Sequence, residues 1–310
     1  MRWIKAKHSP IGVDLSGRSV SAVQLTREGA SWRVRASITV RDIAVLPEAL
    51  ERHNFRGNQI ILSPQPEQLH AEVLDLPPRA SGAPLQQIAH AEMARAAKME
   101  HDPFEMACWD LPAPSRGAAG TAVMAVAFRH QHAEPLLDLL QQHGLEVRAI
   151  DVPACALARA LAPSTEKLTA ILNLAWDAAL LVLVHRGVVL YQRLLPEGAV
   201  AALHAAVATH FAVDADVAEH ILVTKPDQAS DWLRQLIHHY VEALSTELHA
   251  SLSYSARRYP QLALDRLVLA GEGAAIAGLH EILAEHFEAP VALSENPKLA
   301  TAIGLAQYEE

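Results

Sequence analysis

The residues best suited to chemistry lie near the start of the chain, where an aspartate precedes a turn of small side chains. Residues 11–25 alternate between apolar and polar types on both sides of Ser16, Gly17 and Arg18, which predicts two strands joined by a turn. Asp14 ends the first strand. Such a turn lets a phosphate approach backbone N–H groups, and a neighbouring carboxylate can hold a cation or a water. The pattern indicates a phosphate-binding hairpin, and an ordinary hairpin with a polar turn is the alternative that it leaves open.

Two later turns extend this pattern. Strands are predicted at 168–175, 179–185 and 188–194, and the turn 175–178 holds the place that the Ser16-Gly17-Arg18 turn held before. Asn173 precedes this second turn and Asp177 lies in it. A strand at 266–270 then runs into Gly271-Glu272-Gly273 before another helix. The order strand, turn, strand, turn, strand, helix occurs twice, which predicts two similar halves facing a cleft.

The elements that must position these turns follow from the apolar periodicity. In the first half we expect a strand at 32–40, a helix at 46–53 and a strand at 59–62, followed by a helix at 131–143, a strand at 146–151 and a helix at 153–161. Residues 64–130 read as an inserted α+β subdomain with strands at 69–76, 106–111 and 121–128 and a helix at 84–99. The second half adds helices at 196–211, 214–222, 229–258, 274–287 and 297–307 and a strand at 291–293. The domain prediction is a first lobe at 1–165 that includes the insertion, a hinge at 163–165 and a second lobe at 166–310.

Composition limits the possible partners. The chain has 310 residues, 51% of them hydrophobic and 20% charged, with a formal net charge of -9. This composition is typical of a soluble globular protein with a sizeable core. No Lys/Arg cluster interleaved with aromatic residues occurs, so we expect no nucleic-acid partner. Only two cysteines are present, without a Cys-x-x-Cys pair, which favours a reducing, cytoplasmic setting.

Neither a signal peptide nor a membrane span is expected. The basic N-terminus is not followed by an apolar run before Asp14, although it can touch an anionic membrane surface weakly. Residues 168–184 are apolar, but Asn173, Trp176 and Asp177 interrupt them, and we expect two buried strands there.

Metal sites and catalytic nucleophiles have little support in the sequence. The pairs His130 with His132 and His238 with His239 have no acidic or thiol partner at ligand spacing. Cys155 lies on an apolar helical face, and no Gly-x-Ser-x-Gly elbow occurs. We therefore predict no metal ligand and no catalytic residue.

Four stretches together resemble the actin-like ATPase superfamily and, within it, the PilM family of type IV pilus assembly proteins, relatives of the cell-division protein FtsA. These stretches are 12–25, 150–161, 266–274 and 299–306, and the helix at 85–104 is similar to the helix of the inserted subdomain in that family. The resemblance implies an α/β, actin-like (ribonuclease H-like) two-lobed fold with an inserted α+β subdomain.

Departures from the family pattern indicate a nucleotide site that lacks several of the residues the family uses to bind phosphates and a metal ion. Ser16 stands where the family has Gly, Ser21 where it has Lys, and Asn173 where it has Asp. Trp176 adds bulk to the second turn, and Glu272 replaces a Gly. The resemblance assigns the remnant site to Asp14, Ser16, Gly17, Arg18, Asn173, Asp177, Gly271, Glu272 and Gly273, with Asp177 as a possible substitute for the missing carboxylate. We expect no cofactor, and binding of ATP and Mg²⁺ is the alternative.

The function implied by the resemblance is that of a scaffold. A PilM-like protein is expected in the cytoplasm, peripheral at the inner membrane, where it binds the short cytoplasmic tail of an inner-membrane protein, PilN, and contacts other pilus platform proteins. The tail is expected beside the inserted subdomain, near the strands 69–76, 106–111 and 121–128. The alternatives are an active actin-like ATPase or kinase-type phosphotransferase and the cytoplasmic scaffold of a type II secretion system. The second alternative is disfavoured because a membrane span, which such scaffolds normally carry, is not expected here.

Overall fold

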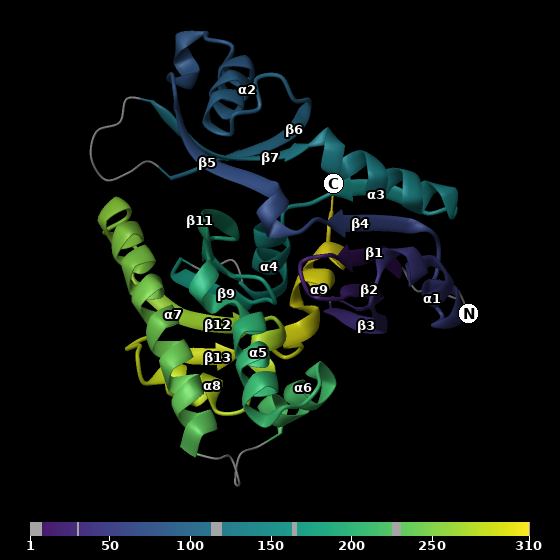
Figure 1. Ribbon diagram of the computed structural model, residues 1–310. Coiled ribbons are helices and arrows are strands. Elements are labelled where there is room, and N and C mark those ends of the chain that lie inside the picture. The colour runs from purple at the N-terminus through teal and green to yellow at the C-terminus, as the bar shows by residue number, and fades with distance from the viewer. Residues whose placement is uncertain (1–7, 30, 113–119, 163–165, 225–230, 310) are drawn as a thin grey trace.

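The computed structural model describes residues 8–29, 31–112, 120–162, 166–224 and 231–309. Within these ranges the chain forms two five-stranded sheets and one three-stranded sheet, with helices packed against them (Figure 1). The predicted hinge at 163–165 lies outside the described residues.

The first sheet is built by the first half of the chain. It contains β1 (His8–Asp14), β2 (Val20–Glu28), β3 (Ser31–Val40), β4 (Gln59–Ser63) and β8 (Glu146–Ile150), in the order β3-β2-β1-β4-β8. β2 is antiparallel to both of its neighbours, β1 and β3, and β4 and β8 run parallel to β1. Ile11 and Val13 point to the face that α1 (Leu46–Arg52) and α3 (His130–Gln142) cover, whereas Gly12 lies on the other face.

The second sheet repeats this topology. It contains β9 (Leu168–Leu174), β10 (Ala179–His185), β11 (Val188–Leu195), β12 (Leu264–Ala270) and β13 (Val291–Leu293), in the order β11-β10-β9-β12-β13. Its hairpin strands are antiparallel, and β12 and β13 run parallel to β9. The predicted duplication is therefore confirmed at the level of strand order and direction, and so is the prediction of two buried strands at 168–184.

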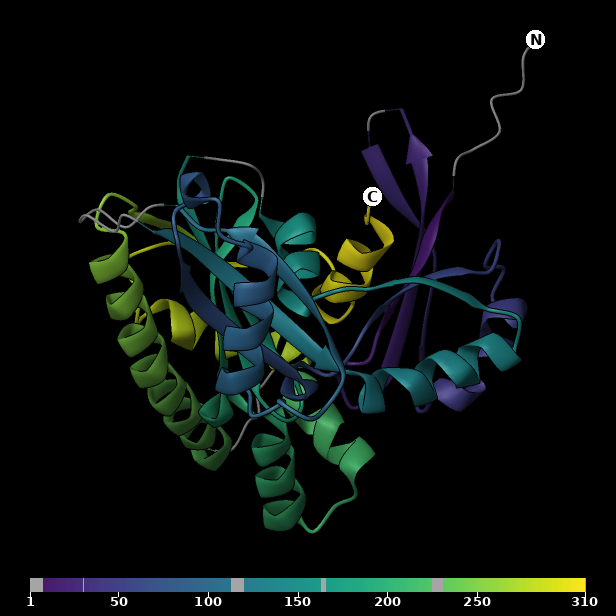
Figure 2. The ribbon, with the colours of Figure 1, turned by 90° about the horizontal axis from the view of Figure 1, so that it is seen from above.

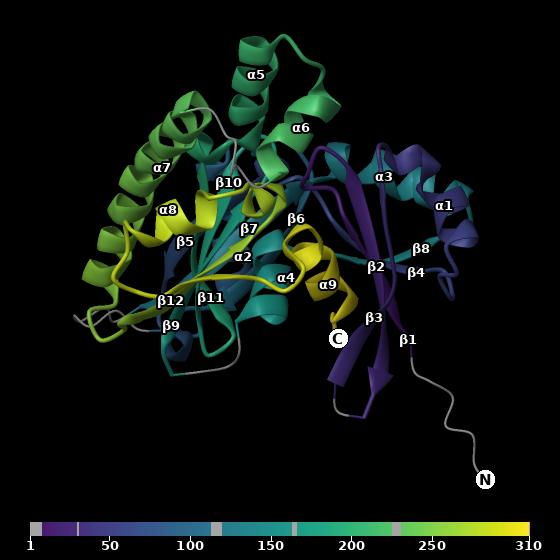
Figure 3. The same ribbon diagram turned by 90° about the horizontal axis from the view of Figure 1, so that it is seen from below.

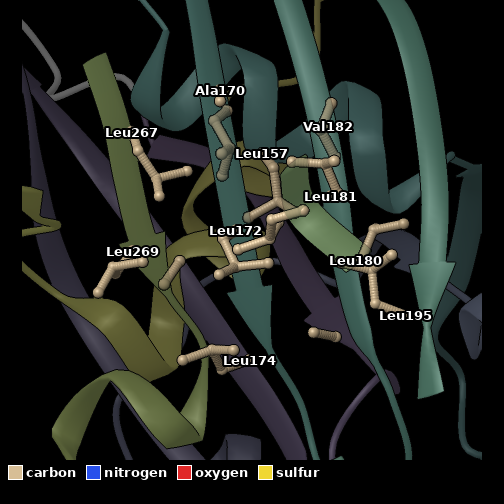
Figure 4. Close-up of a cluster of buried hydrophobic side chains, with 14 of the residues drawn as sticks. Leu157, Ala170, Leu172, Leu174, Leu180, Leu181, Val182, Leu195, Leu267 and Leu269 are labelled. Carbon is tan, nitrogen blue, oxygen red and sulfur yellow. The ribbon is translucent and has the colours of Figure 1, made fainter. Parts of the chain in front are cut away.

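The core of the second half is a continuous apolar layer. Side chains from β9, β10 and β12 meet Leu157 of α4 (Pro153–Leu161) there (Figure 4). The outer helices are α5 (Val200–Phe211), α6 (Ala215–Val223), α7 (Asp231–Arg258) and α8 (Leu279–Ala284). α7 buries residues at helical spacing, including Leu233, Ile237 and Leu244, against this layer.

The inserted sheet contains β5 (Leu69–Leu76), β7 (Thr121–Arg129) and β6 (Phe104–Asp110), paired antiparallel in the order β5-β7-β6. Alternate residues of β7 point to opposite faces. Val123 and Ala125 pack with α2 (Leu85–Ala96), which covers one face (Figure 2), whereas Met124 and Val126 join the core of the second half. The inserted sheet is therefore held between its own helix and the second half.

Two helices cross between the halves. α4 belongs to the first half but packs on the second sheet, and α9 (Ala300–Ala306), which is last in the chain, packs on the first sheet (Figure 3). They approach so closely that a Cβ added at Gly304 would lie 1.9 Å from the carbonyl oxygen of Ala156. A Cβ added at Gly12 would lie 2.2 Å from the carbonyl oxygen of Ala302. These two glycines set the distance between α4, α9 and the first sheet.

Three predicted helices are shorter than expected because each begins with a separate 3₁₀ turn. Pro196–Gly198, Glu272–Ala275 and Pro297–Leu299 form these turns, and α5, α8 and α9 follow them. In the second case Gly278, in the left-handed region with φ 79°, separates the turn from α8. Apolar periodicity does not report such breaks, because the buried face continues across them.

A search of the described residues for helices able to cross a membrane finds no single helix of the required length and apolar composition. One pair, α5 and α6, passes only when taken together, and the two helices are bent by 106° where they meet.

Candidate functional site

Asp14 ends β1, as predicted, but its side chain is buried instead of facing an opening. Its Oδ1 accepts a hydrogen bond of 2.9 Å from the backbone N–H of Ser16. Burial raises the pKa of Asp14, and hydrogen bonds from Ser16 and from Thr301 of α9 oppose this shift. The carboxylate is therefore occupied by its own turn and by the last helix.

A pH-dependent effect on stability follows for Asp14→Asn. Because the pKa of the buried Asp14 carboxyl is raised, the folded state favours the protonated form. The stability that this protonated form contributes is lost as pH rises from about 4, the ordinary Asp value, through the raised pKa. Asparagine stays neutral, so the free energy of unfolding of the variant relative to the wild type should rise with pH, by at most about 1.4 kcal/mol per pH unit. Urea unfolding at several pH values measures this difference. Asp177→Asn, at an exposed carboxylate, is the control, and an equal difference at every pH would contradict the prediction.

The two predicted turns face each other. The guanidinium of Arg18 in the first turn lies 4.9 Å from the ring centroid of Trp176 in the second. The Trp176 ring in turn meets the ring of His204 on α5 edge to face, with 4.9 Å between centroids. Burial lowers the pKa of His204, which favours its neutral form in this stack. A cation–π contact therefore joins the two halves at these turns.

Glu272 fills the space beside the first turn. The backbone N–H of Arg18 donates a hydrogen bond to its carboxylate, and a Cβ added at Gly17 would lie 2.9 Å from its Oε1. Burial raises the pKa of Glu272, and Lys298 opposes this shift. In the structure this carboxylate therefore contacts the first turn.

The Gly271-Glu272-Gly273 corner packs against the end of β9. Gly271 has φ 83°, and a Cβ there would lie 2.5 Å from the carbonyl oxygen of Leu174 and 2.8 Å from Oδ1 of Asn173. A Cβ at Gly273 would lie 2.7 Å from Cβ of Leu174. Both glycines are therefore required by close packing within the second half.

A cavity of about 740 Å³ opens between the halves above these turns. Of the predicted site residues, Arg18 and Glu272 line it, and Trp176, which marks the second turn, does so too. Asp14 and Asn173 are buried, and Asp177 is exposed and is not part of the lining. The charged lining comprises three cations, Arg18, Arg41 and Lys298, and four carboxylates, Asp214, Asp216, Glu219 and Glu272. The cavity is therefore polar with mixed charge.

Several of these lining residues were missed by sequence reasoning. Lys298 lies 3.1 Å from Oε1 of Glu219, which holds the pKa of Glu219 below its usual range. Arg41 follows the end of β3 and could have been found from the strand order, because neighbouring strand ends meet at one edge of the sheet. His204 and Glu219 reach the cavity through the packing of α5 and α6, for which the sequence carries no local signal. Among the described residues, no group of three His, Cys, Asp or Glu side chains is placed to hold a metal ion.

A second cavity, of about 570 Å³, lies beside the inserted sheet and is called the groove below. Its lining comes from the inserted strands, from α3 and from the end of β8: Leu69, Glu105, Met106, Ala107, Val126, Phe128, His130, Ala133, Glu134, Leu137, Ile150, Asp151 and Val152. Most of these side chains are apolar. The carboxylates are Glu105, Glu134 and Asp151, and Nε2 of His130 lies 3.2 Å from Oε1 of Glu105.

Solved structures show where this architecture occurs. The chain is similar to a structure described as the PilM-PilN type IV pilus biogenesis complex, with 18% identity, a TM-score of 0.77 and coverage of 96% of this chain and 98% of that one. It is also similar to the ethanolamine utilization protein EutJ from Carboxydothermus hydrogenoformans, with 13% identity, a TM-score of 0.60 and coverage of 99% and 92%. MreB 5 of Spiroplasma citri bound to AMPPNP gives 10% identity, a TM-score of 0.54 and coverage of 96% and 95%. At these identities the likeness shows the fold, which is actin-like, as predicted.

No curated protein matches the chain. A family model does, over residues 111–306, and it describes the type IV pilus assembly protein PilM. This match covers more than half of the chain and includes both the second turn and the Gly271-Glu272-Gly273 corner. The chain belongs to the PilM family of type IV pilus assembly proteins.

Proposed function

We propose that this protein is a scaffold of the type IV pilus assembly platform and that it binds the extended cytoplasmic tail of a PilN-like inner-membrane protein. Membership of the PilM family supports this proposal. A similar structure, described as a PilM-PilN complex, matches 96% of the chain. Such a tail would place the protein at the cytoplasmic face of the inner membrane, where other platform proteins could contact it. The family match favours the pilus machinery over a type II secretion system.

The groove is the single structural feature that carries the docking proposal. β6 forms one edge of the inserted sheet, and its neighbour in the sheet is β7 on one side only. An extended peptide can add to such an edge through backbone hydrogen bonds while its side chains fill pockets at alternate positions. Met106 of β6 and Leu137 of α3 are half-buried lining residues and provide apolar surface for those side chains.

The charge of the groove indicates what else the tail should carry. Of its three carboxylates, Glu105 pairs with His130 and Asp151 pairs with Arg159, which lies outside the lining. The third, Glu134, is exposed on α3 and gives the groove a negative charge. A tail with apolar residues and a Lys or Arg beside them would complement this lining, mainly through specificity and rate of association.

The docking proposal is tested with the full chain and a labelled synthetic peptide that reproduces the cytoplasmic tail of the PilN-like protein from the same organism. Fluorescence anisotropy should show saturable binding that a scrambled tail of the same composition does not reproduce. Equal binding of the scrambled tail, or no binding of the native one, would contradict docking in the groove.

We also propose that the cavity between the halves carries no ATP chemistry. Asp14 is buried and engaged by Ser16 and Thr301, so it is withdrawn from any phosphate or cation in the cavity. Glu272 occupies the turn that would receive phosphates, and two of the three cations that line the cavity have neighbours of their own, Trp176 for Arg18 and Glu219 for Lys298. Phosphoryl transfer requires several charged groups that can contact the phosphates at the same time.

An active ATPase or phosphotransferase is the competing function, and the volume of the cavity favours it. Thermal unfolding with ATP and Mg²⁺ decides between them. A nucleotide at a hundred times its Kd would stabilise the protein by about 2.7 kcal/mol, whereas we expect no shift in Tm. A clear shift that disappears in Asp14→Ala would establish nucleotide binding instead.

A further inference from the structure

The backbone N–H of Arg18 already has an acceptor from a distant part of the chain. Arg18 lies in the turn after β1, and its acceptor, the carboxylate of Glu272, lies in the turn after β12. The side chain of Glu272 is close enough to Gly17 that an added Cβ would lie 2.9 Å from Oε1. A carboxylate oxygen on a turn N–H makes the same charge-assisted hydrogen bond as a phosphate oxygen there.

The first N–H groups of α5 likewise have acceptors from another part of the chain. The N–H groups of Val200 and Ala201 donate to the carbonyl oxygens of Ala175 and Trp176, at 3.1 and 3.0 Å. The first N–H groups of a helix are the donors that most often receive an anion. Here the second turn supplies their acceptors.

We infer that Glu272 is a built-in substitute for the terminal phosphates of a nucleotide, one that holds the first turn against the second half without any ligand. The inference rests on the proposed absence of ATP chemistry and extends it to a structural role. A nucleotide in a two-lobed cleft bridges the lobes through its phosphates; here the bridge is the Glu272 carboxylate on the Arg18 N–H, with the Arg18 guanidinium on Trp176 beside it. Burial raises the pKa of Glu272, and the nearby Lys298 opposes this shift.

The inference is tested by nuclear magnetic resonance on the Arg18 amide of the full chain. In Glu272→Ala, hydrogen exchange of this amide should be about tenfold faster than in the wild type, since a hydrogen bond to a charged group is lost. Inorganic pyrophosphate should then shift the Arg18 amide resonance in Glu272→Ala and leave the wild-type resonance unchanged. Glu272→Gln keeps an acceptor oxygen and should give a smaller increase in exchange, so the test stands even where the alanine variant does not fold.

Asp216→Asn is the matched control because it also removes a carboxylate from the cavity lining, but at an exposed position away from the turn. Exchange of the Arg18 amide should stay at the wild-type rate there. Unchanged exchange in both Glu272 variants, or a pyrophosphate response that is absent from Glu272→Ala or equally strong in the wild type, would overturn the inference. Stabilisation of the wild type by ATP and Mg²⁺ would instead overturn the proposed function, so the two failures are distinguishable.

Discussion

Replacing Gly304 with alanine is expected to lower the free energy of unfolding by about 3 kcal/mol, the upper end of what an extra methyl group costs in a packed core. The new Cβ would lie 1.9 Å from the carbonyl oxygen of Ala156 and 2.5 Å from its carbonyl carbon. Both are backbone atoms of α4, so the clash cannot be relieved by a side-chain rotation. α9 would have to move away from α4, which separates the two helices that cross between the halves.

Urea unfolding of the full chain measures this cost. Gly144→Ala is the control, because it adds the same methyl group where no atom lies within 4 Å, and its left-handed backbone should cost only about 1 kcal/mol. Gly12→Ala should resemble Gly304→Ala, since its Cβ would meet α9 backbone at 2.2 and 2.5 Å. A Gly304→Ala protein as stable as the Gly144→Ala protein would show that α4 and α9 are not held at this distance in solution.

The strand order was predictable because each strand carries its own signal. β10 and β13 have the predicted bounds, and β9 is buried along its whole length, as predicted from its mainly apolar sequence. The crossing of α4 and α9 was not predictable in this way. The only trace of it in the sequence is Gly12 and Gly304, two glycines inside regular structure. Each is required because backbone from a distant part of the chain packs against it, and no local sequence pattern reports such a contact.

In the cavity between the halves, too, local features were predictable from the sequence and long-range contacts were not. The sequence placed Asp14 at a strand end and Arg18 and Trp176 in facing turns, and these placements are correct. It could not show that Thr301 would cover Asp14, because α9 had to be positioned first. The contact between Glu272 and the turn at Arg18 likewise joins residues more than two hundred positions apart.

The groove was predicted only as a region. The three inserted strands were named, and all three contribute to the lining. The opposite wall comes from α3 and from Ile150 at the end of β8, which read in the sequence as ordinary elements of the first half. A tail bound there would contact both the insertion and the first half.

Leu137→Glu is expected to weaken binding of the PilN-like tail by about 30-fold or more, equivalent to about 2 kcal/mol, which is the loss typical of a central apolar contact. Leu137 is half-buried on α3 and lines the groove opposite β6. A carboxylate at this position would be desolvated by an apolar tail and would add to the negative charge of Glu134 on the same helix. Anisotropy titration of the labelled tail measures the change in Kd.

Leu139→Glu separates this effect from damage to α3. Leu139 is also half-buried on α3, but it is not part of the groove lining, so the same substitution should leave the Kd of the tail within a few-fold of the wild type. Equal losses in the two variants would mean that the helix, and not the groove, was disturbed. Wild-type affinity in Leu137→Glu would place the tail elsewhere on the protein. Because the cavity between the halves shares no lining residue with the groove, neither variant should alter exchange of the Arg18 amide, and the two sites can be tested independently.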